Sequence, residues 1–187
     1  IGANGKGKST LLRTLSGNQP PLSGMVSING ENVQLVSKAR LAKLMSLVFT
    51  SATGAGGLTV RELVALGRHP HTGFLGRLSD NDNRIVDTAM EQVGIAHKAK
   101  NFVAELSDGE RQKTFIAKAL AQETPVIFLD EPTAFLDVAS KLETLYLLHN
   151  LAQKQNKVIL LSTHDVAQSL QLADRIWMID CEGNFLD

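Results

Sequence analysis

The sequence has almost no cysteine and no excess of charge of either sign. Cys181 is the one cysteine in 187 residues, which excludes an internal disulfide framework and fits a reducing compartment. The 19 basic residues balance the 19 acidic ones, so no basic stripe indicates nucleic-acid binding. We therefore expect no nucleic-acid partner.

Long apolar runs are also missing. No run approaches the roughly 18 residues that a membrane-spanning helix needs, and the glycine-rich, polar start does not resemble a signal peptide. Because 43% of the residues are apolar, the chain can still bury the core of one domain. These features predict a cytoplasmic protein without direct membrane insertion, which could still dock on a membrane partner.

Short apolar runs alternate with helical patterns along the chain. Residues 44–49, Val126–Asp130 and Val158–Ser162 are nearly continuous apolar runs, typical of buried parallel strands. Apolar spacing and capping residues predict helices between them. The expected helices cover residues 8–16, 59–66, 80–93, 138–155 and 166–172, with another from Glu110, and shorter strands are expected at 25–28 and 176–179. This alternation indicates an α/β fold with a mainly parallel sheet.

A glycine-rich loop opens the chain. Residues 2–9 (GANGKGKS) match the pattern G-x-x-x-x-G-K-[ST]. Gly2, Gly5 and Gly7 let the backbone turn tightly, so that consecutive N–H groups face a phosphate. Lys8 would then reach the β and γ phosphates, and the Ser9 hydroxyl would ligate Mg²⁺. Taken alone, the pattern fits a plain glycine-rich turn equally well.

Two acids follow the apolar strand Val126–Asp130. At the carboxyl edge of a parallel sheet, Asp130 is suited to hold Mg²⁺ through water, and Glu131 could polarise an attacking water as general base. The alternative is a pair of acids that only solvate a loop. Lys8 lies 122 positions before Asp130. The combination of the two acids with the glycine loop of Lys8 favours the catalytic interpretation.

A third motif, LSDGERQK, precedes a predicted helix. Ser107 and Gly109 precede this helix, so that a hydroxyl and free N–H groups are offered to an anion. By itself this segment would be a helix cap.

Together these motifs resemble those of the ATP-binding subunits of ABC transporters. GANGKGKST is similar to their Walker A loop, LSDGE to the signature and VIFLDE to Walker B. PTAFLD resembles the D-loop, and STHD contributes the switch histidine, His164. The five motifs occur in the family order and span nearly the whole chain.

The resemblance implies a P-loop ATPase core formed by residues 1–187 as a single domain, with a helical subdomain at approximately residues 59–122. It implies ATP and Mg²⁺ as cofactors, with Glu131 and His164 as catalytic residues. Ser9, Asp130 and Thr50 would ligate the metal. The nucleotide-binding residues would be Asn4, Gly5, Gly7, Lys8, Ser9, Thr10, Ser107 and Gly109.

The resemblance also implies partners. Two such domains would form a nucleotide-dependent, head-to-tail homodimer, in which Ser107 and Gly109 act on the ATP of the other subunit. Membrane permease subunits would respond to the cycle of ATP binding and hydrolysis. The protein would then lie in the cytoplasm, peripheral on the inner face of the cell membrane.

One segment indicates the class of substrate. LTVRELVALGRHPHTGFLGR resembles the corresponding region of the importer ATPases for iron-siderophores, haem and cobalamin. It predicts an ATPase that powers import of an iron complex, with the irregular residues 67–77 docking on the permease. A solvated loop is the alternative for Arg68, His69 and His71, and two histidines alone do not indicate a metal site.

Two departures from the family pattern concern the site itself. Thr50 stands where the family has a glutamine that contacts Mg²⁺ and senses the membrane subunit. In the signature, Asp108 and Glu110 bring negative charge near an anion site, for which Arg111 could compensate.

A third departure concerns the ends. Family members have a strand leading into Walker A and an upstream aromatic residue that stacks on adenine, and they continue beyond residue 187 into a helical tail. We therefore expect a fragment of a longer subunit. Two alternatives remain: a nontransport ABC ATPase of DNA repair or translation, and a nucleotide-binding module with little turnover.

Overall fold

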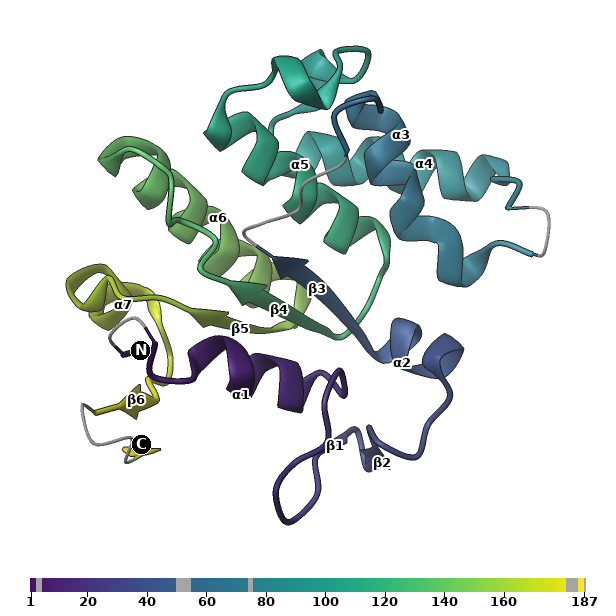
Figure 1. Ribbon diagram of the computed structural model, residues 1–187. Helices are drawn as coiled ribbons and strands as arrows, with labels where there is room; N and C mark the ends of the chain where they lie inside the picture. Colours follow the sequence, from purple (N-terminus) through teal and green to yellow (C-terminus); the bar gives the residue numbers. More distant parts are fainter. Residues whose placement is uncertain (3–4, 50–54, 74–75, 181–184, 187) are drawn as a thin grey trace.

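The computed structural model describes residues 1–2, 5–49, 55–73, 76–180 and 185–186 (Figure 1). Its centre is a parallel sheet with the strand order β3-β4-β5. The strands are β3 (Met45–Phe49), β4 (Val126–Asp130) and β5 (Val158–Ser162). All three strands were predicted, and the prediction of an α/β fold with a parallel sheet is confirmed.

The side chains of β4 alternate between two hydrophobic clusters. Ile127 and Leu129 enter the larger cluster, whereas Phe128 enters the smaller one. Because successive strand residues point to opposite faces, both faces of the sheet are covered. This explains why the strand reads as a continuous apolar run.

Helices lie on both faces of this sheet (Figure 1). Helix α1 (Lys8–Leu15) contributes Leu12 to the smaller cluster, and α6 (Val138–Gln155) contributes Leu148 to the larger one. Helix α7 (Val166–Leu172) contacts α6. The three predicted helices are confirmed within one residue at each end.

Three further helices pack against one another beside the sheet, in the upper part of Figure 1. They are α3 (Val60–Ala65), α4 (Asp80–Gln92) and α5 (Asp108–Ala121). Each begins with a capping box, in which Thr59, Ser79 and Ser107 act as N-caps. The helices agree with the predicted ones, while their grouping as a subdomain of residues 59–122 stays a prediction.

Two segments differ from the sequence expectation. Helix α2 (Lys38–Leu44) was not predicted, although Ser37 caps it. Residues 67–77 were expected to be irregular, yet Leu66–His71 forms a 3₁₀ helix, η1. In η1 Gly67 and Arg68 are buried, so this segment is packed into the fold and is not a solvated loop.

The remaining elements are short. They are β1 (Ser27–Ile28), β2 (Glu31–Asn32), η2 (Ala96–Lys98), η3 (Val103–Glu105), β6 (Met178–Ile179) and β7 (Phe185–Leu186). Strand β6 is shorter than the strand predicted at residues 176–179.

The free edge of β5 faces an apolar cavity of about 670 Å³. Helix α1, strand β5 and the segment from Arg175 to Ile179 contribute to its lining. Beside it, the backbone N–H of Ile179 donates to the carbonyl of Ile1 at 2.8 Å. The phosphate loop is therefore attached to the end of β6. Within the described ranges, no helix has the length and apolarity needed to cross a bilayer.

Gly67 supplies a test of the packing of η1. A Cβ atom at this position would lie 2.3 Å from the backbone carbonyl of Lys118 and 3.1 Å from the Cβ of Ala121. Because backbone cannot move aside cheaply, Gly67→Ala should lower the free energy of unfolding by about 1–3 kcal/mol. Denaturant titration of the full-length protein measures this change.

Gly73→Ala is the matched control, since a Cβ at Gly73 meets nothing within 4 Å. We expect it to change stability by no more than about 0.5 kcal/mol. Equal effects of the two substitutions would contradict the close packing of η1 on α5.

Candidate functional site

The described part of the glycine loop leads directly into α1. Gly5 and Gly7 have φ values of 79° and 89°, which L-residues with a side chain rarely adopt. A Cβ at either glycine would meet nothing within 4 Å, so backbone geometry, rather than crowding, requires glycine here. Gly7 is the N-cap of α1 and has no side chain with which to cap it. No side chain caps the first turn of α1, and an uncapped helix N-terminus suits an anion.

Lys8 is buried in this loop, with 7% of its surface exposed. Its Nζ donates to the carbonyl of Gly2 at 2.7 Å and lies 3.2 Å from Oε1 of Glu131. A buried ammonium group needs such partners to offset its desolvation. The ion pair therefore joins the phosphate loop to the residue that follows β4.

A serine from each side of Asp130 holds its carboxylate. Ser9 Oγ donates to Asp130 Oδ1 at 3.0 Å, and Ser162 Oγ donates to the same oxygen at 2.7 Å. The Ser162 hydroxyl also accepts a hydrogen bond from the Glu131 N–H at 2.9 Å. Ser162, at the end of β5, therefore positions both acids, although sequence analysis did not single it out.

Glu131 adopts a left-handed backbone conformation, with φ at 45°. For a residue with a side chain this costs about 1–3 kcal/mol, and such conformations gather at functional sites. The turn brings Glu131 Oε1 to Lys8, while Oε2 lies 3.9 Å from Nδ1 of His164. His164 is 43% exposed in its side chain, so it flanks the acid from the solvent side.

The arrangement suits an anion with an attached divalent cation. Lys8 and the first turn of α1 offer positive potential, while the Ser9 hydroxyl and the Asp130 carboxylate lie within hydrogen-bonding distance and offer hard oxygen ligands. Among the residues that the structure describes, no group of three or more His, Cys, Asp or Glu side chains is arranged to hold a metal ion by itself. This donor set fits Mg²⁺, which is usually held by one or two protein oxygens together with phosphate oxygens and water.

The signature segment is organised by contacts within its own turn. Ser107 Oγ and N–H both donate to Glu110 Oε2 at 3.0 Å, and the N–H bond is the main cause of the lowered pKa of Glu110. Asp108 pairs with Arg111 at 2.8 Å, and Glu110 with Lys98 at 3.3 Å. The two acids expected to disturb an anion site are therefore neutralised locally, and Arg111 compensates one of them.

The structure brings together only some of the predicted site residues. Lys8, Ser9, Asp130, Glu131 and His164 converge, as the contacts above show. Thr10 is exposed on α1. Ser107 and Gly109 belong to α5, and their contacts stay outside this cluster: Ser107 bonds within its turn, and a Cβ on Gly109 would face Ser140. The predictions for Asn4 and Thr50 lie outside the described residues.

Fold and site together define a P-loop nucleotide-binding domain. Residues 1–134 match the ABC transporter family. The chain therefore belongs to the ABC transporter family, as the motifs predicted.

Two relatives of this chain are ATP-binding proteins of transport systems. The chain is 44% identical over 166 residues to the iron(3+)-hydroxamate import ATP-binding protein of Bacillus subtilis, covering 89% of this chain and 62% of that protein. It is 41% identical over 176 residues to the ferric enterobactin transport ATP-binding protein of Escherichia coli, covering 94% of this chain and 65% of that protein. The chain thus spans less than two thirds of the length of these relatives.

A solved structure has the same fold over the whole chain. It is cbiO1 from Clostridium perfringens, part of the ABC transporter complex cbiONQ. The TM-score is 0.84 at 27% identity, covering 100% of this chain and 74% of that one. The similarity therefore extends past the 134 residues of the family match to the rest of the chain.

Ser162 provides a test of the site geometry. Ser162→Ala removes a donor from Asp130 and an acceptor from the Glu131 N–H, so we expect the free energy of unfolding to fall by about 1–3 kcal/mol. Denaturant titration of the full-length protein checks this. Ser162→Thr keeps the hydroxyl and should recover most of the loss, and equal losses for the two variants would show that the hydroxyl does not hold the acids.

Proposed function

We propose that the protein to which this chain belongs binds and hydrolyses ATP to power import of an iron complex through a membrane permease. The convergence of Lys8 and Ser9 with Asp130 and Glu131 carries the nucleotide part of this proposal. The substrate part rests on relatives at 41–44% identity that are named as import or transport proteins for iron(3+)-hydroxamate and ferric enterobactin. Siderophores, haem and related chelates form the proposed substrate class.

ATP would bind with its phosphates on the glycine loop. The backbone N–H groups after Gly5 and Gly7 and the start of α1 supply donors, and the Lys8 ammonium neutralises charge on the β and γ phosphates. Asn4 and Thr10 complete the proposed loop contacts. Because Lys8 is paired with Glu131, phosphate binding would compete with that carboxylate for the ammonium group.

Mg²⁺ would be held by Ser9 and Asp130, with Thr50 as a third proposed ligand. When bound, the ion supplies charge neutralisation at the phosphate oxygens. Ser162 keeps the Asp130 carboxylate at Ser9, so the two ligands are already oriented. Little reorganisation is then needed when the ion enters.

Hydrolysis would use Glu131 as general base and His164 as the residue that contacts the γ phosphate. The left-handed turn at Glu131 and its N–H bond to Ser162 aim the carboxylate beyond the end of β4. His164 lies 3.9 Å from that carboxylate. An acid and an imidazole are thus placed side by side, where a water molecule and a terminal phosphate can meet.

The proposed assembly is a nucleotide-dependent, head-to-tail homodimer. Ser107 and Gly109 would then contact the nucleotide of the other subunit from the first turn of α5. Apolar side chains that follow Glu131 in the sequence support a protein contact there: Phe135 is 75% exposed and Val138 is 69% exposed. Single exposed apolar residues are common, but two that flank a site suggest an interface.

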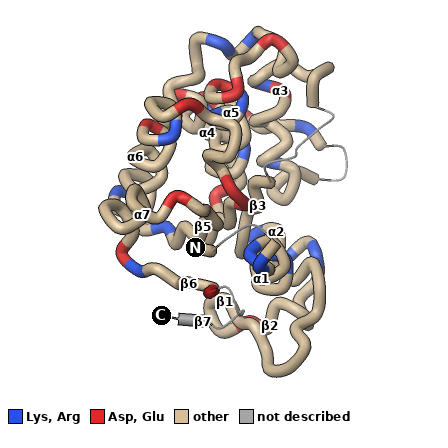
Figure 2. Tube along the Cα trace, turned by 60° about the vertical axis from the view of Figure 1, so that its left-hand side comes forward, with Lys and Arg blue, Asp and Glu red and all other residues tan. Residues whose placement is uncertain are grey.

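The proposed partner outside the dimer is a membrane permease, with the protein peripheral on the cytoplasmic face of the membrane. The exposed residues of η1 would form part of the docking surface. Figure 2 shows basic residues gathered at α1 and α2 and both signs mixed over α3 to α6. Because the totals of basic and acidic residues balance, nucleic acid is not proposed as a partner.

The general-base role of Glu131 can be tested directly. In the full-length protein, Glu131→Gln should lower the rate of Mg²⁺-dependent ATP hydrolysis by about 100-fold or more, because the amide cannot accept the proton from water. ATP-dependent dimerisation should persist, since the amide keeps the shape of the side chain. Phosphate release and light scattering measure the two properties.

Glu143→Gln is the matched control, because Glu143 makes a surface ion pair with Lys113 on α5 away from the proposed site. It should leave hydrolysis unchanged, whereas chelation of Mg²⁺ should abolish hydrolysis in every variant. An unchanged rate in Glu131→Gln would refute the general-base role.

A further inference from the structure

The 3₁₀ helix η1 lies directly against the carboxyl end of α5. A Cβ on Gly67 would approach the Lys118 carbonyl to 2.3 Å, so the two backbones touch at this point. Helix α5 ends at Ala121, and β4 begins at Val126. Segment η1 therefore contacts the connection between the signature helix and the strand that bears Asp130.

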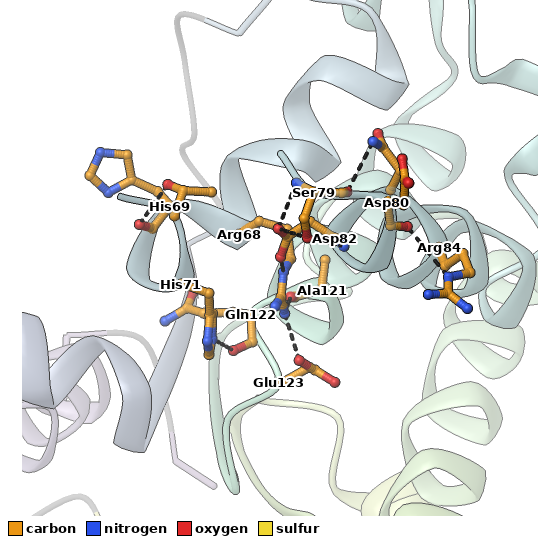
Figure 3. Close-up of polar contacts among 12 residues, drawn as sticks. Arg68, His69, His71, Ser79, Asp80, Asp82, Arg84, Ala121, Gln122 and Glu123 are labelled. Carbon is orange, nitrogen blue, oxygen red and sulfur yellow. Dashed lines mark hydrogen bonds and ion pairs between the residues drawn. The ribbon is translucent and has the colours of Figure 1, made fainter. Parts of the chain in front are cut away.

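Arg68 is the centre of the polar contacts at this connection, which Figure 3 shows in close-up. It is 3% exposed. Its Nη1 donates to the Ala121 carbonyl and to Glu123 Oε2, both at 2.7 Å, and its Nε donates to Asp82 Oδ1 at 2.8 Å. One guanidinium group thus joins three separate elements: η1, the end of α5 and the first turn of α4.

The charges match the helix ends that they join. Ala121 supplies one of the last carbonyls of α5, where a cation is favourable, and Asp82 lies in the first turn of α4, where an anion is favourable. Asp82 Oδ2 also accepts from the N–H and hydroxyl of Ser79, and these bonds together with Arg68 lower the pKa of Asp82 to about 2. The pair is therefore fully charged at neutral pH, and each member is held by more than one bond.

A second set of bonds extends from η1 to the start of β3. His71 Nε2 lies 2.9 Å from the carbonyl of Gln122 (Figure 3), and since a carbonyl only accepts, this nitrogen donates. The Gln122 side chain in turn donates to the carbonyls of Ala42 and Met45 at 2.7 and 2.9 Å. The connection after α5 is thereby fastened to both η1 and the strand β3.

The other side of η1 faces solvent. Leu66 is 49% exposed, and His69 is exposed. One short helix therefore presents an outer surface to a partner while its inner side is bonded to the framework of the nucleotide site.

We propose that Arg68 is a positioning residue that couples the outer surface of η1 to α5 and β4. This inference rests on the proposed function, in which a membrane permease contacts η1. A displacement of η1 is passed through Arg68 to the end of α5, whose N-cap is the signature residue Ser107, and to β4, which ends at Asp130. Packing alone would let η1 slide, whereas three charge-assisted bonds fix its position.

In the experiment, a bulky label is attached to η1, and its effect on hydrogen exchange is measured at the opposite end of α5. In the full-length protein with its native cysteines, Cys181 included, replaced by serine, His69→Cys is labelled with a maleimide carrying a short polyethylene glycol. Hydrogen exchange of the first-turn amides at Arg111 and Gln112 is then measured without nucleotide. Labelling should change their exchange rates by about twofold to thirtyfold, the range found for coupling through packed networks.

Arg68→Met should abolish this response, because it keeps most of the side-chain length but loses the bonds to Ala121, Glu123 and Asp82. The matched control is Arg61→Met, since the guanidinium group of Arg61 on α3 bonds to Asp87 and Asn83 of α4. The response to the label should persist in that variant.

The proposal would be overturned if labelling did not change the exchange rates in the protein that has Arg68. It would also be overturned if labelling changed them equally in Arg68→Met. If Arg68→Met does not fold, Glu123→Ala replaces it. Glu123 is half exposed, and its replacement removes one of the three bonds of Arg68. Labelling should then change the exchange rates less than it does in the protein that keeps Glu123. Because no ATP is used, failure of this coupling is distinguishable from a lack of ATP hydrolysis by the unsubstituted protein.

Discussion

The parallel pairing of β4 between β3 and β5 is the constraint on which the site depends. Its register places Asp130 beside Phe49 on one side and beside Ser162 on the other. Strand β4 is covered on both faces and paired on both edges, so its end is fixed relative to its neighbours. The next residue, Glu131, leaves the sheet in a left-handed turn, and the phosphate loop meets the two acids there.

Charge pairing within the site stabilises the phosphate loop. Lys8 is buried, and an unpaired buried ammonium group would be strongly unfavourable. Glu131 and the Gly2 carbonyl satisfy it. An incoming phosphate would take over that role and leave the carboxylate free to act on water. The same ion pair stabilises the loop, and in the proposed function it would make phosphate compete with Glu131 for the ammonium group.

Much of the fold and of the candidate site could be predicted from the sequence, because local patterns determine these features. Apolar runs predicted the strands, capping residues predicted helix starts, and motif order predicted that Lys8 and Asp130 would meet. Arg68 was not predicted to be buried, since a charged residue between a glycine and histidines usually indicates a solvated loop. Its acceptors lie 14 residues (Asp82), 53 residues (Ala121) and 55 residues (Glu123) further along the chain. The role of Ser162 was missed for the same reason, because it depends on strand register.

The central claim is that Ser9 and Asp130 form one metal-dependent nucleotide site. Calorimetric titration of ATP into the full-length protein, with and without Mg²⁺, tests it most directly when Asp130→Asn is compared with the unsubstituted protein. The account predicts that Mg²⁺ tightens ATP binding in the unsubstituted protein and has little effect in Asp130→Asn. An equal Mg²⁺ effect in both proteins would contradict it.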